Sequence, residues 1–155
     1  MSDSTQKLLV AVDGSKGSND AVSLACGLAQ RLSVPVELVF VFQTATEAII
    51  GLPSGGVSRE DRKLFVPGAV EKLEEEAAEA VFSTARKAVG SADVSVEEKT
   101  LFGLPAEMLL NHADEVPGAM IVMGRRGHSN LTELFLGSVS QRVIHKATCP
   151  VLLAP

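Results

Sequence analysis

The chain has 155 residues, of which 46% are apolar, and its 14 basic and 19 acidic residues give a formal net charge of −5 at pH 7. This length predicts a single domain over residues 1–155, with enough chain to bury a full core. No apolar run approaches the roughly 18 residues of a membrane span, and the acidic balance argues against binding to bulk nucleic acid. The amino-terminus has no signal-peptide pattern, and both cysteines sit in apolar settings typical of reduced core residues. We therefore expect a cytoplasmic protein.

The first part of the chain has the pattern of a strand–helix–strand unit. Residues 7–12 are too apolar for a half-exposed strand, so we expect a strand that is buried on both faces. After a turn at residues 13–15 we predict a helix capped by Ser18 or Asn19. Its apolar residues recur at three-and-four spacing: Ala21, Leu24, Ala25, Leu28, Ala29 and Leu32. A second buried strand at residues 36–42 completes a right-handed βαβ unit with a parallel sheet.

Residues 43–67 have no periodic pattern, because they combine turn residues with a run of charged side chains. A loop of this length inside a compact domain is usually functional or mobile. We expect a mobile surface segment, with a substrate lid as the alternative and a short helical turn at residues 46–50.

The rest of the chain alternates helices and strands. Residues 69–89 form a helix in which the run at residues 74–76, three glutamates, faces water rather than a metal ion. The expected buried stripe of this helix is Val70, Leu73, Ala77, Ala80, Val81, Ala85 and Ala88. Residues 94–101 alternate apolar and charged side chains, as an edge strand does. The remaining predicted elements are a helix at residues 103–115, a buried strand at 119–123, a helix that starts at Ser138 and a strand at 151–154.

These elements amount to five strands alternating with four helices, which predicts one doubly wound α/β domain with ligand sites at the carboxyl ends of the strands. A glycine-rich loop follows the strand at residues 119–123 and leads into the helix at Ser138. Its spacing, Gly124-x2-Gly127-x9-Gly137-Ser138, is neither a Walker A sequence nor the dinucleotide fingerprint. Glycines allow positive φ and close backbone approach, and a helix N-terminus favours phosphate. The loop therefore predicts an anion site.

This glycine spacing resembles the nucleotide-binding signature of the universal stress protein family. The resemblance extends over nearly the whole chain, from the first strand and Asp13 to the final apolar segment at residues 149–153. It implies a five-stranded parallel sheet in the order 3-2-1-4-5 with helices on both faces. The first and fourth strands are then neighbours, so the switch point of the sheet lies between Asp13 and Gly124.

The resemblance also implies ATP or a related adenine nucleotide as ligand, with Mg²⁺ on the phosphates. In the family the aspartate that matches Asp13 lies beside the ribose and phosphates, and the backbone at the position of Val41 contacts adenine. Of Arg125 and Arg126, we expect one to face phosphate and the other solvent. The expected nucleotide-binding residues are Ala11, Val12, Asp13, Val41, Met123, Gly124, Arg125, Arg126, Gly127, His128, Ser129, Asn130, Gly137, Ser138, Val139 and Ser140.

Some of these residues also fit a purely structural role. Asp13 is an ordinary turn former, and Ser138 and Ser140 fit as helix caps. His128 is the one histidine inside the loop, and it is either a ligand contact or an exposed loop side chain. The three histidines have no spacing that suggests a metal site.

The sequence contains no catalytic triad order, no nucleophile elbow and no pair of carboxylates placed for acid–base work. We therefore expect a nucleotide-binding stress-response regulator with at most slow ATP hydrolysis. One alternative is a slow ATPase or phosphotransferase at the same site. Another is a ligand-free dimeric interaction module, which the intact glycine motif disfavours.

The strand predicted at residues 151–154 is apolar and uncharged, and it lies at the sheet edge in the implied order. Such an edge invites pairing with another chain, and a twofold axis across two of them would bury both. Together with the family resemblance, this predicts a homodimer through the strand Val151–Ala154.

Overall fold

The computed structural model describes residues 4–43, 68–128 and 135–155. Its strands are β1 (Lys7–Ala11), β2 (Val36–Phe42), β3 (Val96–Phe102), β4 (Ala119–Gly124) and β5 (Val151–Ala154). Its helices are α1 (Lys16–Leu32), α3 (Ala69–Val89), α4 (Pro105–Glu115) and α5 (Ser138–Lys146). Within these ranges no helix combines the length and hydropathy that crossing a membrane requires. The predicted helical turn at residues 46–50, and all but the first residue of the predicted loop, lie outside the described residues.

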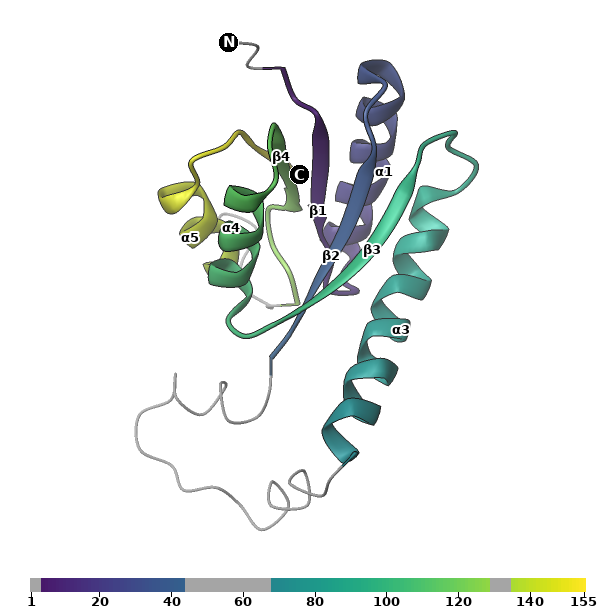
Figure 1. Ribbon diagram of the computed structural model, residues 1–155, viewed down its shortest axis with the longest axis vertical. Coiled ribbons are helices and arrows are strands. Elements are labelled where there is room, and N and C mark those ends of the chain that lie inside the picture. The colour runs from purple at the N-terminus through teal and green to yellow at the C-terminus, as the bar shows by residue number, and fades with distance from the viewer. Residues whose placement is uncertain (1–3, 44–67, 129–134) are drawn as a thin grey trace.

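All five strands are parallel and form one sheet in the order β3-β2-β1-β4-β5. Helices α1 and α3 cover one face of this sheet, and α4 and α5 cover the other (Figure 1). Side chains of the central strand alternate between two cores, so that Leu8 and Val10 pack toward α1 while Leu9 packs toward α4. All three are fully buried, as expected for a strand covered on both faces. The predicted fold class is therefore confirmed.

The buried face of α1 differs from the predicted one. Val22 and Cys26 are buried, whereas Leu24 and Leu32 are 41% and 46% exposed. The alanines at positions 21, 25 and 29 form the centre of the buried face. On the helix surface, Val22 and Cys26 lie to one side of this alanine row, and Leu24 and Leu32 lie to the other, so the spacing alone fits burial of either side. Which flank is buried depends on where α1 rests on the sheet, which periodicity does not show.

The start of α1 also differs. Ser15 is the N-cap, and its side-chain oxygen accepts a hydrogen bond from the backbone N–H of Ser18 at 3.2 Å. Neither Ser18 nor Asn19 caps the helix, because the helix begins earlier, at Lys16. The Ser18 side chain is instead buried, where its hydroxyl accepts from the backbone N–H of Asp13 at 3.3 Å. The first turn of α1 is therefore tied to the end of β1.

Helix α3 buries its apolar stripe only toward its carboxyl end. Val81 and Phe82 are buried, and the Phe82 ring lies edge-to-face against Phe40, with centroids 6.3 Å apart. Leu73 is 40% exposed and Ala80 is exposed, so their predicted burial is wrong. The physical reason is that the amino-terminal part of α3 extends beyond the sheet, and sequence periodicity does not report where a sheet ends (Figure 1).

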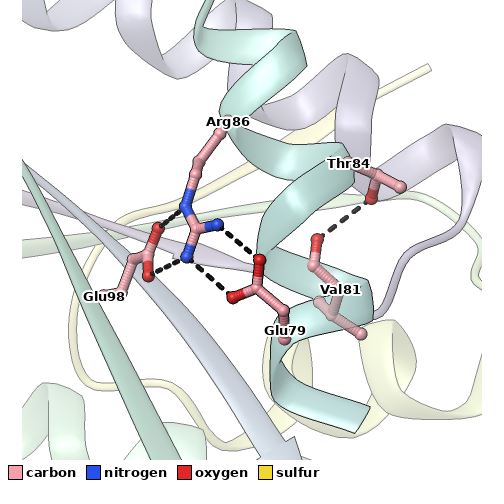
Figure 2. A network of polar contacts seen from close by, with 5 residues as sticks. All are labelled: Glu79, Val81, Thr84, Arg86 and Glu98. Atoms are coloured by element: carbon pink, nitrogen blue, oxygen red, sulfur yellow. Dashed lines mark hydrogen bonds and ion pairs between the residues drawn. The ribbon is translucent and has the colours of Figure 1, made fainter. Parts of the chain in front are cut away.

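A guanidinium ties α3 to the edge strand β3. Arg86 donates to both carboxylate oxygens of Glu98, at 2.6 and 2.9 Å, and to both of Glu79, at 2.9 and 3.2 Å (Figure 2). The hydrogen bond from Arg86 lowers the pKa of Glu79, and the two acids raise the pKa of Arg86 above its usual range. Because these side chains are largely exposed, the network orients α3 on the sheet and adds little stability.

The strand β2 carries a buried carboxylate near the amino-terminal edge of the sheet. Glu37 is 7% exposed, and its Oε2 lies 2.5 Å from Nε2 of His112 on α4. Its Oε1 accepts from Nζ of Lys7 at 3.1 Å, and the same ammonium group donates to Glu97 at 2.7 Å. Burial raises the pKa of Glu37, but the hydrogen bonds with His112 and Lys7 outweigh it and hold the pKa below its usual value. His112 thus fastens α4 to the sheet.

Candidate functional site

A cavity of about 270 Å³ opens where the strands β1, β2 and β4 end. Because β1 and β4 are neighbours whose connecting helices lie on opposite faces, the cavity lies at the switch point of the sheet. Its lining residues are Ala11, Val12, Asp13, Ser18, Val39, Phe40, Val41, Pro105, Leu109, Met123, Gly124, Arg126, Gly127, His128, Gly137, Ser138, Val139 and Ser140. The predicted residues Ser129 and Asn130 lie outside the described part of the chain.

Asp13 follows β1 and is held by the loop that leads into α1. Its Oδ1 accepts from the backbone N–H of Ser15 at 2.9 Å, and its own N–H donates to Ser18 at 3.3 Å. Asp13 therefore has the structural role predicted from the sequence, that of a turn former, and it also lines the cavity. The two roles use different oxygens, because Oδ2 is directed toward Gly127.

Two glycines of the loop, Gly124 and Gly127, are required for close approach rather than for positive φ. None of Gly124, Gly127 and Gly137 has a positive φ, so the expectation drawn from glycine flexibility is wrong for these three. A Cβ on Gly127 would lie 2.5 Å from Oδ2 of Asp13, so any side chain there would displace the carboxylate. The loop after β4 therefore touches the carboxylate that follows β1.

Gly124 packs against the first turn of α1, backbone to backbone. A Cβ on Gly124 would lie 2.7 Å from the carbonyl carbon of Gly17, and one on Gly17 would lie 2.6 Å from the carbonyl oxygen of Arg126. Two glycines, one from each element, thus bring the amino-terminus of α1 next to the end of β4. Gly17 has no local signal in the sequence, because its requirement arises from a contact with residues more than a hundred positions away.

The helix α5 begins at the cavity. Gly137 is its N-cap, with no side-chain capping bond, and the Gly137 N–H donates to the carbonyl of Arg125 at 3.0 Å. The Ser140 hydroxyl is buried and donates to the carbonyl of Gly124 at 3.0 Å. The interpretation of Ser138 and Ser140 as side-chain caps is therefore wrong, since Gly137 takes that position. With the helix start lining the cavity, its dipole and first N–H groups favour an anion there.

Of the two adjacent arginines, only Arg126 is among the described residues that line the cavity. The backbone N–H of Arg125 donates to the carbonyl of Ala154 at 2.9 Å, which continues the pairing of β4 with β5. The structure thus distinguishes the two arginines, which the sequence did not, because Arg126 lines the cavity and Arg125 does not.

His128 connects the two loops that meet at the cavity. Its Nε2 lies 2.6 Å from the backbone carbonyl oxygen of Asp13. Because a carbonyl oxygen can only accept, Nε2 carries a proton and donates this hydrogen bond. The side chain is exposed, and it lines the cavity.

Some of the lining was not predicted from the sequence. The unpredicted lining residues are Ser18, Val39, Phe40, Pro105 and Leu109. The apolar members come from β2 and from the first turns of α4. Val39 and Leu109 belong to one core with Met123 and form an apolar wall, whereas the Phe40 side chain packs toward α3. Their presence depends on how α4 lies over β2, for which the sequence carries no local signal.

Three described lining residues carry ionisable side chains, namely Asp13, Arg126 and His128. The carboxylate of Asp13 and the guanidinium of Arg126 carry opposite charges. The described ranges contain no group of three or more His, Cys, Asp or Glu side chains that could hold a metal ion. Helix dipole, backbone N–H groups and Arg126 therefore supply the attraction for an anion.

Comparison with known proteins agrees with this architecture. Residues 4–155 match the universal stress protein family. Universal stress protein YxiE of Bacillus subtilis is 34% identical over 149 residues, covering 95% of this chain and 97% of YxiE. A universal stress protein solved in complex with cAMP has a TM-score of 0.66 and 24% identity, covering 97% of each chain. The universal stress protein from Archaeoglobus fulgidus in complex with dAMP has a TM-score of 0.53 and 26% identity, covering 96% of each chain. Since the family match spans nearly the whole sequence, this chain belongs to the universal stress protein family.

Proposed function

We propose that this protein binds an adenine nucleotide, ATP or a relative such as cAMP, in the cavity and acts as a stress-response regulator. The observation that carries the proposal is the convergence of the glycine loop, the start of α5 and Arg126 on one cavity at the switch point. Membership of the universal stress protein family supports the stress role. The similar Archaeoglobus protein, solved with dAMP, supports an adenine nucleotide as the ligand class.

The chemistry of the lining residues supports a role for different residues with different parts of the nucleotide. The loop and helix end, with Gly127, Arg126 and Ser138, offers N–H groups and a cation and suits the phosphates. The lining residues Leu109 and Met123 are apolar and suit a flat base. Val41 on β2 also lines the cavity, and we propose that its backbone contacts the edge of adenine.

Asp13 also lines the cavity. Its Oδ1 is engaged by the Ser15 N–H, and its Oδ2 is directed into the site beside Gly127. A single carboxylate oxygen suits Mg²⁺ that keeps most of its ligands from phosphates and water. The same oxygen can accept a ribose hydroxyl, and the two roles differ in whether binding depends on Mg²⁺.

The experiment is to extract freshly purified protein, identify any bound nucleotide and titrate the ligand-free protein with ATP, cAMP and GTP. We expect adenine nucleotides to bind with up to one site per chain and GTP to bind more weakly. A product assay on the same sample separates a regulator from a slow ATPase or phosphotransferase. Failure of every nucleotide to bind at millimolar concentration would leave only the ligand-free interaction module.

We also propose that the protein is located in the cytoplasm and forms a homodimer through β5.

A further inference from the structure

The helices that follow the neighbouring strands β1 and β4 each carry a buried serine in their first turn. Ser18 is the third residue of α1, and Ser140 is the third residue of α5. Their exposed fractions are 4% and 3%, and both residues line the cavity. Each hydroxyl donates to a backbone carbonyl, that of Ser18 to Ser15 at 3.1 Å and that of Ser140 to Gly124 at 3.0 Å. The two serines thus occupy matching positions on either side of the switch point.

The hydrogen bond of Ser140 closes the glycine-rich loop. Whereas the bond of Ser18 stays within one turn of its own helix start, Gly124 lies at the end of β4, 16 residues before Ser140. The next carbonyl along the chain, that of Arg125, accepts from the Gly137 N–H at 3.0 Å. These two hydrogen bonds, the β4–α5 clamp, fix the start of α5 to the end of β4. The Gly137 donor is a main-chain group, so Ser140 is the member of the clamp that depends on a side chain.

The first turn of α5 has backbone N–H groups to offer a ligand. The first bond within the helix runs from the Gln141 N–H to the Gly137 carbonyl at 2.9 Å. The N–H groups of residues 138–140 therefore have no partner within the helix, and Gly137 supplies no capping side chain. In α1, by contrast, the Ser15 side chain accepts from the Ser18 N–H. Because residues 138–140 line the cavity, their N–H groups suit the oxygens of a phosphate.

We propose that Ser140 is a positioning residue for phosphate, which acts through the backbone of α5 and not as a ligand. A serine hydroxyl has one proton to donate, and that of Ser140 goes to the Gly124 carbonyl. The hydroxyl therefore has no proton for a phosphate oxygen. Its role is to hold the first turn of α5 where the N–H groups of residues 138–140 meet the ligand. This inference rests on the proposed nucleotide function and names a residue on which the phosphate affinity depends.

Loss of the hydroxyl should act on the phosphate part of the ligand. Without it the start of α5 is held to β4 by the Gly137 bond, and a shift of the helix start weakens hydrogen bonds to phosphate, which depend steeply on geometry. Loss of one hydrogen bond to a charged group lowers affinity by about tenfold or more. Leu109 and Met123, which suit the base, lie on other elements, so binding of a nucleoside should not change.

The test compares ATP with adenosine, which share base and ribose and differ in the phosphates, by calorimetry in a chelator. We expect Ser140→Ala to bind ATP at least about tenfold more weakly than wild-type protein does, and to bind adenosine equally well. Ser140→Thr retains the hydroxyl and should restore ATP affinity. Ser140→Cys has only a weak S–H donor, so its ATP affinity should fall between the two, and it replaces Ser140→Ala if that variant does not fold.

Val143→Ala is the matched control, because Val143 is fully buried on the same helix and is not among the described residues that line the cavity. It should lower the temperature of unfolding yet keep the wild-type ratio of ATP affinity to adenosine affinity. An unchanged ratio in Ser140→Ala, or the same change in Ser140→Thr or Val143→Ala, overturns the inference. If wild-type protein binds neither ATP nor adenosine, the proposed function itself is wrong.

Discussion

The carboxylate of Asp13 occupies the space in which a side chain on Gly127 would begin, since a Cβ there would lie 2.5 Å from Oδ2. The two residues are more than a hundred positions apart and follow neighbouring strands. The acid and the glycine loop therefore fix each other's positions, and a change in either one should disturb the site as a unit.

Replacing Gly127 by alanine or valine should abolish nucleotide binding or weaken it at least about tenfold, because the side chain displaces the Asp13 carboxylate. Calorimetry with ATP measures the effect, and thermal unfolding checks that the fold survives. Gly137→Ala is the control. Its Cβ would make only ordinary contacts, the nearest at 3.5 Å, so its loss should be smaller. Gly137→Val should also prevent binding, because the larger side chain enters the cavity. Equal affinities for Gly127→Ala and Gly137→Ala would contradict the steric argument.

A second prediction concerns the packing of α1 on β4. Gly17→Ala places a Cβ 2.6 Å from the carbonyl oxygen of Arg126, and backbone cannot move aside cheaply. We expect the free energy of unfolding to fall by about 1–3 kcal/mol and nucleotide affinity to fall with it.

Gly27→Ala, in the same helix, is the matched control. A Cβ on Gly27 meets no atom within 4 Å, so alanine should stabilise the protein by about 0.5–1 kcal/mol through its higher helix propensity. Urea unfolding of both variants measures the two effects. Similar stabilities for Gly17→Ala and Gly27→Ala would show that α1 and β4 do not meet as closely as the structure indicates.

The sheet was predictable because a strand covered on both faces needs an unbroken apolar run, and residues 8–12 and 119–123 are such runs. In the strand at residues 36–42, Glu37 interrupts the apolar run. Its burial inside the sheet depends on His112 and Lys7, which lie far away in the sequence. Local patterns carry no record of such a partner. The buried flank of α1 was mispredicted for the same reason, because it is set by the surface on which the helix rests.

The candidate site likewise contains residues that were predictable from the sequence and residues that were not. The glycine loop and Asp13 were visible because loops at strand ends concentrate glycine and polar residues, and the structure brings them to one cavity. The apolar wall from Val39 and Leu109 was not visible, since leucine or valine in a core and in a pocket look alike in a sequence. The separation of Arg126 from Arg125 required the path of the backbone after β4.

A third prediction concerns stability in acid. The pKa of Glu37 is lower in the folded protein than its ordinary value of 4.5, so the folded state gains stability from the ionised carboxylate. This gain is fully present above about pH 4.5 and is lost as the pH falls through the folded pKa. Glu37→Gln should lower the free energy of unfolding at about pH 7 by about 1–3 kcal/mol and flatten its decline in acid.

Urea midpoints at about pH 7 and about pH 3.5 measure this decline on either side of the carboxyl range. Glu79→Gln is the control, because Glu79 forms its ion pair with Arg86 at the exposed surface, and it should change stability by less than about 0.5 kcal/mol. If both variants lose stability equally, burial of Glu37 has no special energetic role.

A fourth prediction separates the two roles proposed for Asp13. Asp13→Ala should weaken binding of the Mg²⁺ complex of ATP more than binding of ATP in a chelator, if the carboxylate acts on the metal. Asp13→Asn retains an oxygen to accept from the Ser15 N–H, so it tests charge without opening the loop. Calorimetry with and without Mg²⁺ measures both. Equal losses under the two conditions would assign Asp13 to the ribose or to the turn alone.

The last prediction concerns assembly through β5, which lies at one end of the strand order. The carbonyls of Pro150 and Ala154 accept from the N–H groups of Ile121 on β4 and of Arg125 just after it, both at 2.9 Å. Backbone groups of alternate residues point to opposite sides of a strand in a parallel ladder, so those of Val151 and Leu153 are directed to the outer edge. An antiparallel copy of β5 across a twofold axis would pair with them.

The same geometry decides which variants test the dimer most cleanly. Val151 and Leu153 pack partly against the core under α4 and α5, so Val151→Asp and Leu153→Asp place a charge at the edge but also disturb that core. Leu153→Pro removes only the N–H that faces outward, which an edge strand tolerates. We expect wild-type protein to sediment as a homodimer at micromolar concentration and all three variants to sediment as folded monomers. Leu32→Asp, a charge on an exposed side chain of α1, should leave the dimer intact. A wild-type monomer, or a dimer that persists in all three β5 variants, would contradict pairing through this strand.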